Sequence, residues 1–287
     1  MTNEHPTALI LGGTGRSGSL LADKLARHGG RGVTARTAAR RGADVRFDWD
    51  DPATHRQALT GADRLYLVTP VLRVRYAEQV AAFLDLAEAA GVRHVTFLST
   101  HNADRAPQEV DIAAVETDLA ARSTVTSSIL RPAWVMQNFA DEHLPVIDGA
   151  ITAPSGGGRE AFVDADDIAA VAAETLLNPE SHADARYTLT GPQALTFGEA
   201  ADLISEASGR PIAYNDIDQE AWIGGALAAG IPADYAAMLR WLTGAIIAGD
   251  GATPTDDIEK VTGRPPTSFR EFAARNARAW TVEGTGK

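Results

Sequence analysis

The sequence predicts an α/β fold, with a doubly wound parallel sheet followed by a smaller, helix-rich C-terminal region. Three features predict it: short apolar runs alternate with helical stretches in the first half, a glycine-rich turn joins the first run to the first helix, and helical patterns dominate from residue 196 onward. Apolar strands that alternate with helices are typical of a parallel sheet covered by helices on both faces.

The first half of the chain supplies the expected sheet. Helical patterns occupy residues 16–28, 74–90 and 109–122, and Gly91 is expected to end the second of these helices. The strands, in chain order, are expected at residues 8–11, 32–35, 44–47, 64–68, 94–98 and 125–130.

The alternation changes after Pro132. We expect a loop, a helix ending near Leu177, a strand and then mainly helices, at residues 152–158, 168–177, 186–190, 196–207, 219–229, 233–248 and 268–280. The sequence therefore predicts one domain at residues 1–150 and a smaller one at residues 151–287, with the boundary near residues 132–150 and later segments returning to the sheet.

The composition excludes several classes of protein. The chain has 287 residues and no cysteine, which excludes disulfide scaffolds, cysteine-ligated zinc, iron–sulfur clusters and thiol catalysis. Its 38 acidic and 26 basic residues give a formal net charge of −12, which argues against nucleic acid as a partner. No secretory signal and no run of about 18 apolar residues is visible, so we expect a cytoplasmic protein with no membrane partner. The sequence does not specify an oligomeric state.

Acidic residues gather at Asp164, Asp166 and Asp167, just before an expected helix. Carboxylates at this position cap a helix and complement its dipole. No His–Glu–His spacing accompanies them, so we expect no metal site.

A glycine-rich turn follows the first expected strand and opens the first helix. Its glycines, Gly12, Gly15 and Gly18, recur at every third position. Such glycines permit a tight turn and a close approach of the backbone to a pyrophosphate, and the helix N-terminus favours the negative charge. This pattern indicates a Rossmann-type dinucleotide-binding domain at residues 1–150, with a substrate region at residues 151–287.

Arginine near the end of the second strand favours NADP(H) over NAD(H). Arg36 stands where an acidic residue would usually bind the ribose 2′-hydroxyl, and Arg40 and Arg41 follow. A guanidinium binds a 2′-phosphate through paired donors, although a solvated turn is the alternative for these arginines. Asp48 and Trp49 are expected near the adenine, with core packing an equal alternative for Trp49.

These residues resemble a known family. The glycine loop, residues 47–50, 130–139, 162–168 and 189–197, and Arg36, Ser99 and Thr100 resemble NmrA-like atypical short-chain dehydrogenases/reductases. They are particularly similar to the ergot-alkaloid reductase branch and its bacterial relatives. The resemblance implies pyrophosphate contacts from Gly12, Thr14, Gly15, Arg16, Ser17 and Gly18, and a 2′-phosphate contact from Arg36. It further implies cofactor contacts from Asp48, Trp49, Thr69, Pro70, Ser99, Pro132, Trp134 and Val135.

The usual acid of short-chain dehydrogenases is missing. No lysine lies between Lys24 and Lys260, so no Tyr-x-x-x-Lys pair exists there. Three explanations stay open: a substrate that needs no proton at the hydride step, a replacement acid, or a protein that binds NADP without chemistry. His101, with Asp111 and Asn102 behind it, is the candidate acid, and Thr100 beside it is the second candidate catalytic residue.

Residues after the sixth strand are candidates for substrate contacts. Met136, Asn138, Phe139 and Phe162 are expected at the pocket, where aromatic walls suit a flat or hydrophobic substrate, and core packing is the alternative. The sequence therefore predicts an NADPH-dependent reductase of an imine or iminium, a quinone or an enone. The alternatives are a non-catalytic, redox-sensing regulator and an isomerase or cyclase without net redox chemistry.

Overall fold

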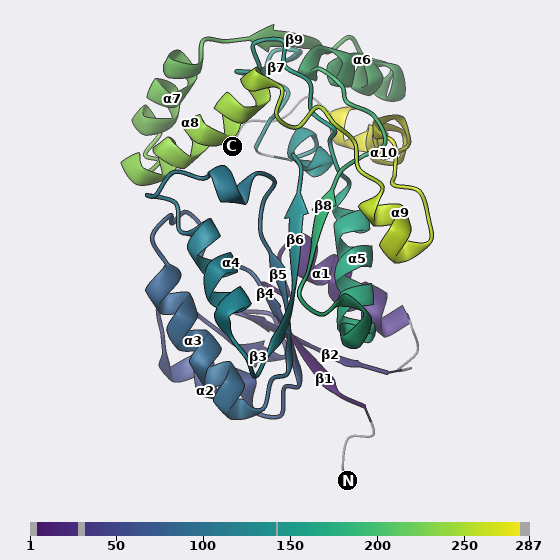
Figure 1. The fold of residues 1–287 in the computed structure, drawn as a ribbon. Helices are drawn as coiled ribbons and strands as arrows, with labels where there is room; N and C mark the ends of the chain where they lie inside the picture. Colours follow the sequence, from purple (N-terminus) through teal and green to yellow (C-terminus); the bar gives the residue numbers. More distant parts are fainter. Residues whose placement is uncertain (1–4, 28–31, 142, 282–287) are drawn as a thin grey trace. The chain divides into compact units, whose positions relative to one another are not determined.

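The computed structural model describes residues 5–27, 32–141 and 143–281 (Figure 1). The chain forms two compact units. The first, the sheet unit, contains residues 1–132, 165–188 and 260–263, and the second unit contains residues 133–164, 189–259 and 264–287. This division differs from the expected one at residue 150, because the chain leaves the sheet at Pro132 and returns to it at Ala165.

The sheet unit is built on a seven-stranded parallel sheet. The strand order is β3-β2-β1-β4-β5-β6-β8. The strands are β1 (Thr7–Leu11), β2 (Thr34–Ala39), β3 (Val45–Arg46), β4 (Arg64–Leu67), β5 (His94–Leu98), β6 (Thr126–Pro132) and β8 (Ala185–Leu189). The chain winds outward in one direction from β1 to β3 and in the other from β4 onward. A crevice for ligands is typical at this reversal, beyond the carboxyl ends of β1 and β4.

Helices cover both faces of this sheet. Helices α3 (Ala77–Ala90) and α4 (Ile112–Ala121) pack together on one face, and α1 (Arg16–Arg27) and α5 (Ala165–Leu177) pack together on the other (Figure 1). The short helix α2 (Ala53–Leu59) packs beside α3. Gly91 ends α3 in the left-handed conformation, at φ 104°, as predicted. Burial on both faces explains why all five residues of β1 are buried.

The second unit has its own core. Two short strands, β7 (Ala150–Ala153) and β9 (Ala213–Asp216), pair in parallel. The helices are α6 (Phe197–Ser208), α7 (Gln219–Ala228), α8 (Ala233–Ala248), α9 (Asp257–Thr262) and α10 (Phe269–Asn276). The residues of α9 are divided between the two units, with 257–259 in the second unit and 260–262 in the sheet unit. Aromatic rings from four separate segments meet in this core: Phe139, Phe162, Phe197 and Phe269.

Some elements differ from their expected positions. The second strand begins two residues later than expected, at Thr34, and runs to Ala39, which matters for the site below. The sequence patterns did not indicate α2, β7, β9 or α9, each of which has seven residues or fewer. The expected end of the first helix at His28 lies outside the described residues. Within the described part of the chain, no helix is both long and apolar enough to cross a membrane.

Candidate functional site

The glycine loop between β1 and α1 has space only for glycine at two positions. A Cβ atom on Gly13 would lie 2.5 Å from the Cβ of Thr37, and one on Gly18 would lie 2.3 Å from the carbonyl oxygen of Gly12. Gly12 itself is left-handed, at φ +65°. The amide of Gly15 donates to the Gly12 carbonyl over 2.8 Å, which closes the turn. The loop therefore presents bare backbone at the N-terminus of α1, an arrangement that suits an anionic group.

A cavity of about 1150 Å³ opens beside this loop, at the carboxyl ends of β1, β2, β3 and β4. All of its lining residues belong to the sheet unit. Seven residues predicted to bind the cofactor line it together: Gly12, Thr14, Gly15, Asp48, Trp49, Thr69 and Pro70. The volume and the position at the strand reversal suit part of a dinucleotide.

Trp49 combines a place at the cavity with core packing. It lines the cavity and also packs edge-on against Phe47 and Phe83, with ring centroids 5.0 and 5.3 Å apart. Asp48 shapes the same turn, because its Oδ1 accepts the backbone N–H of Asp50 over 3.1 Å. The aromatic cluster thus holds one cavity wall in place.

Four arginines line the cavity, and two of them are paired with carboxylates. Arg46 lies 3.1 Å from Asp51, and Arg73 lies 2.6 Å from Asp50. Arg40 and Arg41 are exposed and have no ion-pair partner among the described residues. They leave the carboxyl end of β2 and run into Gly42, which lies near Thr14 of the glycine loop. Their guanidinium groups are therefore available to an anionic ligand.

Arg36 does not line the cavity, which corrects its predicted role. Its guanidinium donates to the carbonyls of Ala58 and Thr60, each over 2.7 Å, at the end of α2. The cause is the position of β2: Leu11 pairs with Ala38, so Arg36 lies in mid-strand and Arg40 follows the carboxyl end. The side chain stabilises the end of α2, where backbone carbonyls need donors.

The other predicted pyrophosphate residues do not line the cavity. Arg16, Ser17 and Gly18 form the first turn of α1 and are not among the lining residues. Gly18 is buried beneath Gly12 and acts through the close packing of loop and helix.

The residues after β5 are held by a partly buried ion pair. The hydroxyl of Ser99 donates to Glu116 over 2.5 Å, and Arg131 binds the same carboxylate through two nitrogens, at 3.0 and 2.5 Å. Ser99 and Glu116 are both buried. The single hydroxyl proton of Ser99 is thus committed to Glu116.

The surroundings of His101 differ from the prediction. Its backbone N–H donates to the carbonyl of Pro132 over 2.9 Å, which ties the ends of β5 and β6 together. Asp111 does not support it: this carboxylate accepts the backbone N–H groups of Tyr76 and Ala77, at 2.5 and 2.8 Å, and so begins α3. Neither Thr100 nor His101 lines the cavity described above.

The predicted substrate residues Met136, Phe139 and Phe162 lie in the core of the second unit. Each is about 1% exposed. The rings of Phe139 and Phe162 are 5.1 Å apart, and both contact Phe197. The prediction that these three line a pocket is corrected in favour of its alternative, core packing. Asn138 is partly exposed.

The segment predicted to lie along the nicotinamide forms part of the second unit after Pro132. Val135 pairs with Val163, and the N–H of Trp134 donates to the carboxylate of Glu160 over 3.1 Å. The indole Nε1 of Trp134 is buried and has no hydrogen-bond partner in the part of the chain that the structure describes.

Glu160 was not singled out from the sequence. It is 4% exposed, and burial together with the nearby charge of Asp250 raises its pKa to about 7. The sequence nevertheless contains an indication that Glu160 is buried, because the apolar run from Ala161 to Val163 follows it and indicates a buried segment.

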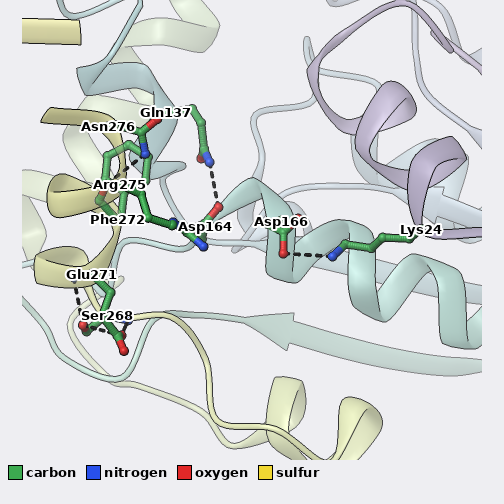
Figure 2. Close-up of polar contacts among 9 residues, drawn as sticks. All are labelled: Lys24, Gln137, Asp164, Asp166, Ser268, Glu271, Phe272, Arg275 and Asn276. Carbon is green, nitrogen blue, oxygen red and sulfur yellow. Dashed lines mark hydrogen bonds and ion pairs between the residues drawn. The ribbon is translucent and has the colours of Figure 1, made fainter. Parts of the chain in front are cut away.

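The acidic residues around the start of α5 make structural contacts (Figure 2). Asp164 accepts the amide of Gln137 over 2.7 Å and pairs with Arg275, while Asp166 pairs with Lys24 at 2.8 Å. Asp166 and Asp167 lie in the first turn of α5, where they complement the helix dipole. Among the residues that the structure describes, no cluster of histidine and acidic side chains could hold a metal ion.

Known proteins resemble this chain along nearly its whole length. The model of the NmrA-like family matches residues 4–264. The uncharacterized oxidoreductase YesF of Bacillus subtilis is 36% identical, over 98% of either chain. Festuclavine dehydrogenase easG of Aspergillus fumigatus is 30% identical, over 96% of this chain and 99% of its own. The structure of Citrobacter sp. triphenylmethane reductase complexed with NADP(H) superposes with a TM-score of 0.71 at 23% identity, covering 95% of this chain and 99% of that one. The resemblance to the ergot-alkaloid reductases is thereby confirmed, and the chain belongs to the NmrA-like family.

Proposed function

We propose that this protein is an NADPH-dependent reductase that transfers hydride to a small organic substrate. The observation that carries the proposal is the cavity beside the glycine loop, where Arg40 and Arg41 have no ion-pair partner among the described residues. Two family members with related sequences are named as an oxidoreductase and a dehydrogenase, and a structural neighbour is a reductase in complex with NADP(H). These names support the reaction class and the cofactor.

The residues present fit NADPH. Gly12, Thr14 and Gly15 would hold the pyrophosphate with backbone amides, since the neighbouring Gly13 and Gly18 leave no space for a Cβ and bring the loop close to the helix. Arg40 and Arg41 would hold the 2′-phosphate in place of Arg36. When bound, NADPH supplies the hydride.

The substrate class is inferred from the missing acid. The chain has no Tyr-x-x-x-Lys pair, and the hydroxyl of Ser99 already donates its hydrogen bond to Glu116. An iminium carbon accepts hydride and becomes a neutral amine, so such a substrate needs no proton from the protein at that step. Quinones and enones remain within the proposal, with His101 and Thr100 as the proposed proton donors.

The test is NADPH oxidation, followed by absorbance, across cyclic imines, quinones and enones, with NADPH and NADH affinities measured in parallel. Arg40→Gln with Arg41→Gln should weaken NADPH binding about 10- to 100-fold, the value of one or two charge-assisted hydrogen bonds, and leave NADH binding nearly unchanged. Arg36→Gln is the matched control, because it removes a neighbouring arginine that faces α2 instead.

Two outcomes would contradict the proposal. Equal losses for both cofactors would remove Arg40 and Arg41 from the 2′-phosphate site. Tight NADPH binding without oxidation of any substrate would favour a regulator or a non-redox enzyme.

A further inference from the structure

Two loops wall the outer part of the cavity, and one ion pair joins them. The first loop, Asp48–Asp50, follows β3, and the second, Pro70–Arg73, follows β4. Arg73 Nη2 lies 2.6 Å from Asp50 Oδ1, and both side chains line the cavity. The pair therefore bridges the two walls.

The tip of the second loop is apolar and exposed. Val71 is 83% exposed and Leu72 is 48% exposed, and both line the cavity. Leu72 also adopts a left-handed backbone, at φ 58°. This conformation is strained for a branched apolar residue and is typical of ligand-binding segments. Within the described chain, neither burial nor backbone preference explains why two apolar side chains and a left-handed backbone occur at this exposed position. A flat ligand in the cavity would cover both side chains.

The Asp50–Arg73 pair is not needed to give the cavity positive charge. Arg40 and Arg41 already provide two unpaired cations, and Arg46 is paired with Asp51. Arg73 and Asp50 are 41% and 64% exposed, and an ion pair this exposed contributes little to stability. Such a pair opens readily, yet it strengthens when a ligand displaces the surrounding water.

We propose that the Asp50–Arg73 pair is a latch that closes the Pro70–Arg73 loop over the adenosine half of the bound dinucleotide. The latch sets the residence time of the cofactor, with Val71 and Leu72 covering the adenine. This inference rests on the proposed function.

The test measures NADPH dissociation by stopped-flow fluorescence, with adenosine 2′,5′-bisphosphate as the displacing ligand. Asp50→Asn and Arg73→Gln should each speed dissociation about 3- to 5-fold, and the double variant should be no faster than the faster single variant. The same two variants should weaken binding of adenosine 2′,5′-bisphosphate itself, which lacks the nicotinamide.

A matched control exists in the second unit. Arg240 and Glu220 form an ion pair of 2.7 Å between α8 and α7, and they are 42% and 64% exposed, close to the values for Arg73 and Asp50. Glu220→Gln and Arg240→Gln should leave the dissociation rate unchanged.

The Asp50→Asn variant decides between a latch and a direct ligand contact. If Arg73 binds the cofactor directly, freeing it from Asp50 leaves dissociation unchanged or slower, and the latch is wrong. The latch is also wrong if the effects of the two single variants on the dissociation rate add fully in the double variant. If the wild-type protein binds neither NADPH nor the bisphosphate, the proposed function itself fails.

Discussion

Glu160 carries a buried carboxyl group with few compensating contacts. Its Oε1 accepts one backbone N–H, from Trp134, and its carboxyl atoms lie so close to Gly251 that a Cβ there would be 2.0 Å from Oε2. Burial, with Asp250 nearby, raises its pKa to about 7. The carboxyl group is thus protonated in the folded protein at pH values where the unfolded chain has released the proton.

This difference predicts how stability depends on pH. The pKa of Glu160 is about 7 when folded and about 4.5 when unfolded, so between these values the folded state binds the extra proton and stability falls as pH rises. Glu160→Gln should remove this fall, which is on the order of 3 kcal/mol across the window. Urea unfolding at pH 5, 6, 7 and 8 measures it, with the exposed Glu206→Gln as control.

The comparison between variants is essential because a second group acts in the opposite direction. Burial lowers the pKa of His94 to about 4, so its contribution to stability rises with pH between about 4 and 6.5. The wild-type slope alone therefore does not isolate Glu160. A Glu160→Gln protein with the same pH slope as wild type would contradict the assignment.

The first turn of α1 shows how one element sets the shape of the site. Gly18 is a helical residue with the Gly12 carbonyl against its Cα. A Cβ at this position would clash with the Gly12 carbonyl, so Gly18→Ala should shift the backbone and push the loop outward. We expect NADPH binding to weaken at least about 10-fold.

The control for this prediction is another helical glycine. Gly225 in α7 has open space around it, so Gly225→Ala should stabilise the protein by about 0.5–1 kcal/mol and leave binding unchanged. Isothermal titration and thermal unfolding separate the two effects. Undiminished NADPH affinity in Gly18→Ala would show that the loop does not bind the pyrophosphate.

The elements also show which parts of the site could be predicted from sequence. The glycine loop was predictable because an apolar strand, its glycines and a helix follow one another directly. The position of β2 was not, because Thr34–Ala39 reads TARTAA and has no apolar run to fix its start. The expected strand ended at residue 35 and β2 ends at Ala39, so the prediction placed Arg36 at a carboxyl end that Arg40 follows in the structure. The burial of Met136, Phe139 and Phe162 depends on contacts with Phe197 and Phe269, far along the chain, which local spacing does not reveal.

At the scale of the whole molecule, the chain leaves the sheet unit and returns to it. Helix α5 belongs to that unit, packs against α1, and has most of its residues buried. β8 then completes the sheet beside β6. A boundary drawn at residue 150 therefore removes one helix and one strand from the sheet unit.

This arrangement predicts the behaviour of fragments. A fragment of residues 1–150 should show no cooperative unfolding, because it lacks α5, which packs against α1, and β8, which pairs with the edge of β6. A fragment of residues 1–188, which adds α5 and nearly all of β8, should regain protected amides in β1 and β4. Hydrogen exchange compares them with the full chain, and cooperative unfolding of the shorter fragment would contradict the prediction.

The return of α5 to the sheet has a consequence for biosynthesis. The ribosome releases β6 before it has made the partner strand that covers its edge, and residues 133–164 must emerge in between. Nascent chains consequently display an open strand edge for the time needed to translate more than fifty further residues, at about 5–20 residues per second. During those seconds the growing polypeptide is a substrate for chaperones and for edge-to-edge association, so a slow codon within this stretch would lower the yield of folded protein without changing a single amino acid.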